Sequence, residues 1–169
     1  YIAADSFAGE RERKTIQQLL ASPLTDSEIL LGKILTAFIP TIITTYAVTL
    51  STTLVINFAW MNAFHEFRLI FPNMVALVQI LFLYPELAFF TILTMCWMST
   101  RVSKVMEATQ FGSVVIFPVL LIMFGSFLGL PVLTVNFAIL LVAVFALLDS
   151  GLFKVASRRF SREALLTKI

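Results

Sequence analysis

The amino-acid sequence predicts an all-α, polytopic membrane protein with four transmembrane helices preceded by a short cytoplasmic amphipathic helix. Three observations lead to this fold class. Hydrophobic residues make up 59% of the 169 residues and charged residues only 13%, whereas soluble domains carry about 25% charged residues. Four apolar stretches are long enough to cross a bilayer. The basic residues that flank these stretches lie almost entirely on one side.

The four predicted spans cover residues 29–58, 74–98, 111–130 and 134–153. Each is long enough to cross a hydrocarbon core of about 30 Å as a helix. Residues 131–133 leave room only for a tight turn between the last two spans, which we place on the external side. Pro40 lies inside the first span and is expected to kink it. Residues 29–153 thus form the predicted transmembrane domain.

The distribution of Lys and Arg predicts the orientation of these spans. Eleven of the twelve basic residues flank the spans on one side, and only Arg68, between the first two spans, falls on the other. The eleven are Arg11, Arg13, Lys14, Lys33, Arg101, Lys104, Lys154, Arg158, Arg159, Arg162 and Lys168. The positive-inside rule places these residues in the cytoplasm. We therefore expect a multi-pass protein of the cell membrane, with the N-terminal helix and the basic tail (residues 154–169) in the cytoplasm.

Residues 1–28 form a short charged segment ahead of the first span. Ser6 is expected to cap a helix in which Glu10 pairs with Lys14 four residues later. An apolar edge at helical spacing follows, and Pro23 is expected to end the helix. This edge consists of Ile16, Leu19 and Leu20.

A capping signal stands directly before the first apolar run. Thr25 and Glu28 have the spacing T-x-x-E, in which each side chain can bond the other residue's backbone N–H. The N-terminal region therefore reads as a helix, a turn, a cap and then a membrane helix.

Residues 6–33 resemble a segment of a known transporter family. They read SFAGERERKTIQQLLASPLTDSEILLGK. This run resembles the cytoplasmic segment after the second membrane helix of type-2 ABC exporter permeases. There, an E-x-E-R/K-x-x-T-hydrophobic pattern precedes a Leu pair, a small-small-Pro turn and a Gly-Lys pair. The resemblance is closest to the prokaryotic branch associated with sodium or drug export. Gln17 departs from the pattern, where Glu is common, and leaves the helix prediction intact.

Two weaker similarities accompany this one. Residues 99–103 and 108–110 resemble that family's loop between the fourth and fifth helices, and residues 159–166 resemble its basic C-terminal end. The resemblance implies that the first two helices of the permease would precede Tyr1. The chain would then be a C-terminal piece of a longer protein.

The resemblance also implies a partner for the N-terminal helix. In that family the corresponding helix is the coupling helix, which sits in a cleft of a cytoplasmic ATP-binding cassette subunit. The implied contact residues are Glu10, Arg11, Glu12, Arg13, Lys14 and Ile16. ATP and magnesium would be bound by that subunit and no cofactor by this chain, and a second permease copy, giving a homodimer, is expected. The residues alone leave an alternative open, an interfacial helix lying on lipid headgroups.

Glu86 is the most unusual residue of the spans, because it lies near the middle of the second span beside Pro85. A carboxylate there costs about 2.5–3.5 kcal/mol on insertion scales and normally faces the bundle interior. One interpretation is a cation or proton site on the transport path. The other is a structural hydrogen bond to Tyr84, Thr91, or a Ser or Thr of the first span.

Other polar residues of the spans are expected to have structural roles. Asp149 is expected to form a surface pair with Lys154, Arg158 or Arg159. Seven hydroxyl residues of the first span are expected to serve helix packing, with a polar pathway as the alternative. They are Thr41, Thr44, Thr45, Thr49, Ser51, Thr52 and Thr53.

The external loop, residues 57–73, is expected to hold a helix at the membrane surface, with Trp60 as an interfacial anchor. His65 and Cys96 are the only residues of their types, which excludes a multi-histidine site, a cysteine metal cluster and a disulfide within the chain. The sequence contains no Walker A loop and no H-E-x-x-H, G-x-S-x-G or C-x-x-C motif. We therefore expect neither an enzyme nor a nucleic-acid partner.

Taken with the resemblance, the sequence predicts the permease subunit of an ABC exporter, in which a separate ATPase subunit drives export across the cell membrane. One alternative is a secondary transporter or channel that uses the intramembrane carboxylate of Glu86. The other is a membrane scaffold in which residues 1–28 dock another protein.

Overall fold

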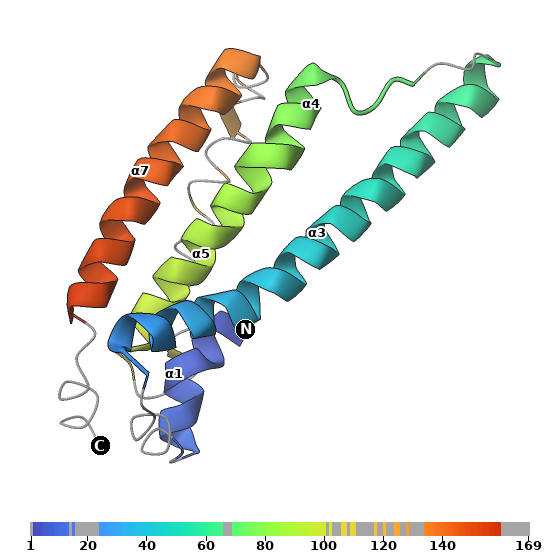
Figure 1. The fold of residues 1–169 in the computed structure, drawn as a ribbon. Coiled ribbons are helices and arrows are strands. Elements are labelled where there is room, and N and C mark those ends of the chain that lie inside the picture. The colour runs from blue at the N-terminus through green and yellow to red at the C-terminus, as the bar shows by residue number, and fades with distance from the viewer. Residues whose placement is uncertain are drawn as a thin grey trace.

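Figure 1 shows the fold in a computed structural model, in which every regular element of the described residues is a helix. The structure describes residues 2–13, 15, 24–65, 69–100, 102, 106–107, 109–110, 117, 120, 124–125, 128 and 134–159. The third predicted span, residues 111–130, lies almost entirely outside the described residues, and so does the turn expected at 131–133.

Among the described residues, three helical segments are long and apolar enough to cross a membrane. They are Ser27–Phe64, Met74–Ser99 and Val135–Ala156. The first lies in α3 (Asp26–Phe64) and the third in α7 (Val135–Arg159). The second is built from α4 (Met74–Val78), η1 (Gln79–Leu83) and α5 (Tyr84–Ser99). A shorter helix, α1, covers Ile2–Glu12.

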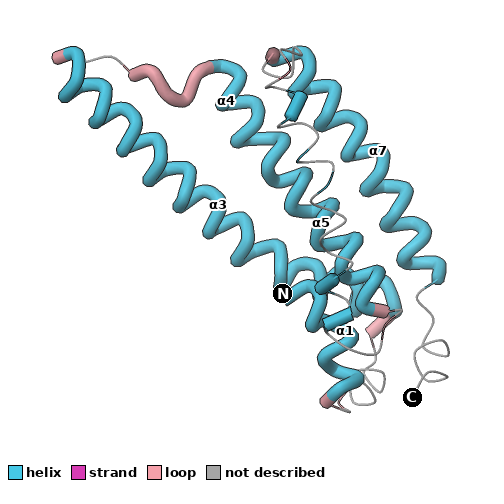
Figure 2. Tube along the Cα trace, turned by 180° about the vertical axis from the view of Figure 1, so that it is seen from behind, coloured by secondary structure: helices cyan, strands magenta, loops and turns pink. Residues whose placement is uncertain are grey.

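α5 is the central helix of the described bundle. Figures 1 and 2, which view the molecule from opposite sides, both show α5 between α3 and α7, with α1 at its lower end. α3 lies close to α5 at this end and diverges from it towards the other end. The start of α3, the end of α5 and the end of α7 therefore meet near α1.

The buried core lies at the same end as α1. It consists of Ala3, Ala4, Ala8, Ile29, Leu30, Ile34, Ala37, Ile92, Leu93, Met95, Cys96 and Ala156. Away from this core few residues are fully buried: the buried share is 11% in the most apolar stretch of α3 and 17% in those of the other two segments. Residues 85–99 of α5 are half-buried or buried, whereas most of α3 beyond Pro40 is exposed. Helices this apolar and this exposed require lipid or further protein segments around them.

The start of α3 confirms the predicted capping box. Thr25 Oγ1 accepts a hydrogen bond from the Glu28 N–H at 3.4 Å, and Glu28 Oε2 accepts one from the Thr25 N–H at 2.7 Å. Pro40 lies inside α3 and has no N–H to donate to the carbonyl of Thr36, which weakens the helix there. Figure 1 shows the first turns of α3 at an angle to the remainder.

The second segment contains a π-helical turn, η1, in which the Tyr84 N–H donates to the Gln79 carbonyl five residues earlier. This turn directly precedes Pro85. Proline lacks an N–H and crowds the carbonyl of the residue four places before it, and a widened turn relieves that clash. Pro85 therefore accounts for η1.

The predicted loop helix between residues 57 and 73 is not a separate element. α3 continues through Phe64 and ends at His65, whose φ of 53° is in the left-handed region. Leu69 to Asn73 contain no helical residue. The apolar run simply extends as a helix until this left-handed residue ends it.

Asn57 holds the returning chain against α3. Its Nδ2 donates to the carbonyls of Thr53 at 2.8 Å and Phe71 at 2.5 Å. Its Oδ1 accepts from the N–H groups of Ile70 at 2.8 Å and Phe71 at 3.3 Å. One amide side chain therefore satisfies backbone groups of a segment that has no helical bonds of its own.

The prediction that Ser6 caps a helix is wrong, because α1 begins at Ile2 and Ser6 lies inside it. Arg13 and Thr15, which the prediction placed in the same helix, are not helical, and the remainder, including Ile16, Leu19, Leu20 and Pro23, lies outside the described residues. At the other end of the chain, α7 continues to Arg159, into the region assigned to the tail.

Candidate functional site

The contact between α1 and α5 centres on Ser99, the last residue of α5. Its Oγ accepts a hydrogen bond from the Ala8 N–H at 2.8 Å and donates one to the Ala4 carbonyl at 2.8 Å. Ser99, Ala4 and Ala8 are all fully buried. Small side chains at positions 4 and 8 allow the backbone of α1 to approach α5 closely.

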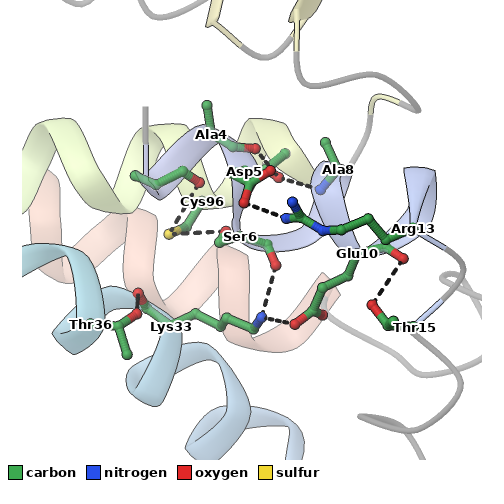
Figure 3. Close-up of polar contacts among 12 residues, drawn as sticks. Ala4, Asp5, Ser6, Ala8, Glu10, Arg13, Thr15, Lys33, Thr36 and Cys96 are labelled. Carbon is green, nitrogen blue, oxygen red and sulfur yellow. Dashed lines mark hydrogen bonds and ion pairs between the residues drawn. The ribbon is translucent and has the colours of Figure 1, made fainter.

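One turn earlier on α5, Cys96 makes a second pair of contacts with α1. Its Sγ accepts a hydrogen bond from the Ser6 hydroxyl at 3.6 Å and lies 3.9 Å from the Ala3 carbonyl (Figure 3). Cys96 is fully buried and Ser6 is 9% exposed. The thiol and the hydroxyl thus satisfy each other in an apolar surrounding.

Lys33 of α3 connects that helix to α1. Its Nζ donates to the Ser6 carbonyl at 2.8 Å and forms an ion pair with Glu10 Oε1 (Figure 3). The two side chains are only 18% and 22% exposed. We refer to Ser6, Glu10, Lys33, Cys96 and Ser99 as the α1 junction.

A second ion pair joins α1 to Arg13, the residue that follows it, and is more exposed. Arg13 Nη2 pairs with Asp5 Oδ2, and their side chains are 59% and 25% exposed. Gly9 lies beneath this bridge, where an added Cβ would collide with the Asp5 carboxylate and the Arg13 guanidinium. The pair therefore occupies the face of α1 that any larger side chain at position 9 would fill.

The structure describes some of the six residues that the resemblance placed at the partner contact. Glu12 and Arg13 are exposed at the end of α1, whereas Glu10 turns inward to Lys33. Arg11 belongs to α1, but its side chain lies outside the described set, as do Lys14 and Ile16. The predicted pair of Glu10 with Lys14 falls outside the described residues, and the described partner of Glu10 is Lys33.

Glu86 has a partner that the sequence did not indicate. The carboxyl group of Asp149 in α7, a helix that packs on α5, lies near enough to that of Glu86 to interact with it electrostatically. Asp149 is only 4% exposed, and neither of its oxygens accepts a hydrogen bond from any described donor. Two ionised carboxylates repel each other at short range, and a proton or cation shared between them would remove that repulsion.

The prediction of a surface pair for Asp149 is therefore wrong. Asp149 points into the interface of α5 and α7, where Phe90 and Phe145 also meet with ring centroids 5.2 Å apart. The hydroxyl of Thr91, one of the expected partners of Glu86, instead donates to the Leu87 carbonyl of its own helix at 2.7 Å.

The hydroxyl residues of α3 bond mainly to their own helix. Thr44, Thr45, Thr49 and Thr52 each donate to the carbonyl four residues earlier, at 2.7 to 2.9 Å. The same four residues line an open cavity of about 420 Å³. Their donors are therefore satisfied, and they present only acceptor lone pairs to the cavity.

No group of three or more His, Cys, Asp or Glu side chains that could hold a metal ion occurs in the part of the chain that the structure describes. The two candidate functional features are thus the α1 junction and the carboxyl groups of Glu86 and Asp149. Sequence reasoning missed Ser99, Cys96 and Asp149 as members of these sites. A single sequence does not show which polar residues of an apolar helix are buried in contacts with other helices.

A family model described as "ABC-2 family transporter protein" matches residues 1–161. No curated protein matches the chain, and no solved structure does.

Proposed function

The chain belongs to the ABC-2 transporter family as a membrane permease, and on this premise we propose that it couples ATP hydrolysis by a separate cytoplasmic subunit to export of cargo. The ATP-binding cassette subunit would bind at the end of α1 and the residues that follow it. ATP and magnesium would be held by that subunit.

The observation that carries this proposal is the attachment of α1 to two membrane helices. Buried polar contacts join α1 to α5 through Ser99 and to α3 through Lys33. A displacement of α1 would therefore reach both helices. At its end, α1 presents the exposed charges of Glu12 and Arg13, and such charges favour specific orientation of a partner.

The position of α1 also supports an orientation. Arg13, Lys33 and Lys154 lie on elements that meet at the α1 end of the bundle. By the positive-inside rule this end would face the cytoplasm, which is where an ATPase subunit could reach it.

A homodimer in a lipid bilayer is the assembly that we propose. The outer surfaces of α3 and α7 expose many large apolar side chains, among them Ile43, Leu54, Phe58 and Leu147. A second permease copy and lipid would together cover this surface.

The test is the ATPase rate of the co-purified complex with the permease variant Glu12→Lys, which reverses an exposed charge of α1. We expect loss of most of the ATPase stimulation or of subunit binding, because like charges then face each other at the contact. Lys154→Glu is the matched control, as it reverses an exposed charge of α7 at the same end. Equal rates for wild type and Glu12→Lys would contradict the proposed contact.

A second candidate function, ion-linked transport without an ATPase, is favoured by the nearness of two intramembrane carboxyl groups, Glu86 and Asp149, on the packed helices α5 and α7. It would use this pair as a proton or cation site on the path. The test is proton entry into liposomes that hold the full-length permease alone, followed with an internal pH dye under an imposed pH gradient. Flux that Glu86→Gln and Asp149→Asn both abolish would support this candidate, and absence of flux in the wild type would reject it.

A further inference from the structure

The way in which Ser99 contacts α1 differs from an ordinary helix packing contact. The Ala8 N–H and the Ala4 carbonyl are the donor and acceptor that close one turn of an α-helix. In this structure each of them bonds to the Ser99 hydroxyl at 2.8 Å. The side chain of α5 is thus attached to the main chain of α1, without a flexible side chain of α1 between them.

The neighbouring contact strengthens this attachment. Cys96 and Ser99 lie three residues apart, on one face of α5. Together they reach the α1 backbone or side chains at Ala3, Ala4, Ser6 and Ala8, all of which are at most 9% exposed. The contact therefore spans two turns of α1 and is closed to water.

The attachment of α1 to α3 is of another kind. It depends on Lys33, whose long side chain has four rotatable bonds and remains 18% exposed. A side chain of this length can keep its ion pair with Glu10 while the helices shift, whereas the short side chains of Cys96 and Ser99 cannot keep their contacts. α1 is thus held rigidly by α5 and more loosely by α3.

We propose that α1 and the C-terminal turns of α5 move as one rigid unit, and that Ser99 is the positioning residue that passes a displacement of α1 to α5. This inference rests on the proposed coupling function of α1 and names the helix that receives the movement. Glu86 lies thirteen residues before Ser99, or about 20 Å along the helix. A tilt of the unit would therefore move Glu86 relative to Asp149 in α7.

A disulfide between α1 and α5 tests the rigid unit. In the variant Ser6→Cys the new thiol would face Cys96, since the Ser6 Oγ and Cys96 Sγ are 3.6 Å apart. Cys96 is the chain's single cysteine, so no competing disulfide can form within the chain. The variant would be studied in the co-purified complex in nanodiscs, before and after oxidation. A non-reducing gel reports the cross-link as a change in the mobility of the permease, and the absence of a band of doubled mass shows that the disulfide lies within one chain. Ser6→Cys combined with Cys96→Ala is the control that cannot form it.

A rigid unit predicts that the oxidised and reduced complexes hydrolyse ATP at equal rates. If α1 and α5 must separate during the cycle, oxidation stops ATP turnover and a reductant restores it, which would overturn the proposal. Failure of the cross-link to form would overturn the α1–α5 contact itself.

Ser99→Ala tests the role of the hydroxyl. We expect uncoupling: the complex still assembles in a pull-down, but the permease no longer stimulates ATP hydrolysis. Adding the Ser6→Cys change and oxidising it should restore stimulation, because a covalent link replaces the lost hydrogen bonds. A purely structural defect would not respond to oxidation. Should Glu12→Lys have no effect while the disulfide is tolerated, the coupling function fails and the rigid unit stands.

Discussion

The ion pair between Lys33 and Glu10 permits a worked prediction about the stability of the α1 junction. Lys33→Met removes the ammonium group and keeps most of the apolar stem. It deprives Glu10 and the Ser6 carbonyl of their donor. Exposed pairs contribute about 0–1 kcal/mol, whereas breaking a buried pair costs about 3–5 kcal/mol. With both side chains about one-fifth exposed, we expect a loss near 2 kcal/mol.

The assay is thermal unfolding of the full-length permease in detergent. At about 2–4 °C per kcal/mol for a chain of this size, the apparent melting temperature should fall by about 4–8 °C. The double variant Lys33→Met with Glu10→Gln should recover part of this loss, because it no longer leaves an unpaired carboxylate. Lys154→Met, at an exposed lysine of α7, is the matched control.

Two results would refute this reasoning. A shift for Lys33→Met no larger than that of the control would mean that the pair behaves as an exposed salt bridge. Strict additivity of the two changes in the double variant would mean that Lys33 and Glu10 do not interact, and that the cost arises from the bond to the Ser6 carbonyl alone.

Three further predictions concern a helix glycine, a helix cap and an amide side chain that bonds to the backbone. Gly9→Ala should leave the melting temperature within about 3 °C of the wild type. The gain in helix propensity, about 0.5–1 kcal/mol, offsets the loss of the exposed Asp5–Arg13 ion pair, which contributes about 0–1 kcal/mol. A larger drop would show that the ion pair contributes more than this. Thr25→Ala should cost about 1 kcal/mol through loss of the cap, seen as faster hydrogen exchange in the first turn of α3, and unchanged exchange there would argue against the cap. Asn57→Leu should speed amide exchange in residues 70–71 by about fivefold or more, since each lost hydrogen bond contributes about 1 kcal/mol; wild-type protection in that segment would contradict the Asn57 contacts.

Features that depend on neighbours in the chain could be predicted from the sequence. The capping box of Thr25 and Glu28 needs only residues three apart, and the helical segments of α3, α5 and α7 follow from unbroken apolar runs. The π-helical turn η1 also has a local cause, Pro85, although the sequence did not specify it. Each of these features has its cause within a few residues.

Features that depend on tertiary contacts could not be predicted. Lys33 pairs with Glu10 in the structure although the two lie 23 residues apart, and nothing in the sequence around Glu10 indicates this partner. Asp149 and Glu86 lie on different helices, and nothing local distinguishes a carboxyl group that meets another carboxyl from one that reaches the surface. Ser6 resembles a helix cap because serine favours both a cap and a buried contact with a neighbouring helix.

The π-helical turn at Gln79–Leu83 has a consequence for how the second segment can change over evolutionary time. Such a turn amounts to one extra residue in the helix, and each residue turns an α-helix by about 100°. α4 and α5 are therefore out of phase with each other, although they share an axis. Deleting one residue of the turn would rotate α5 against α4 by about 100° and swing Glu86 away from α7, while every remaining side chain kept its identity. The nearness of Glu86 to Asp149 thus depends on the number of residues in the second segment as well as on their types. An insertion or deletion in the residues before Pro85 would turn Glu86 away from Asp149 without replacing either carboxyl group.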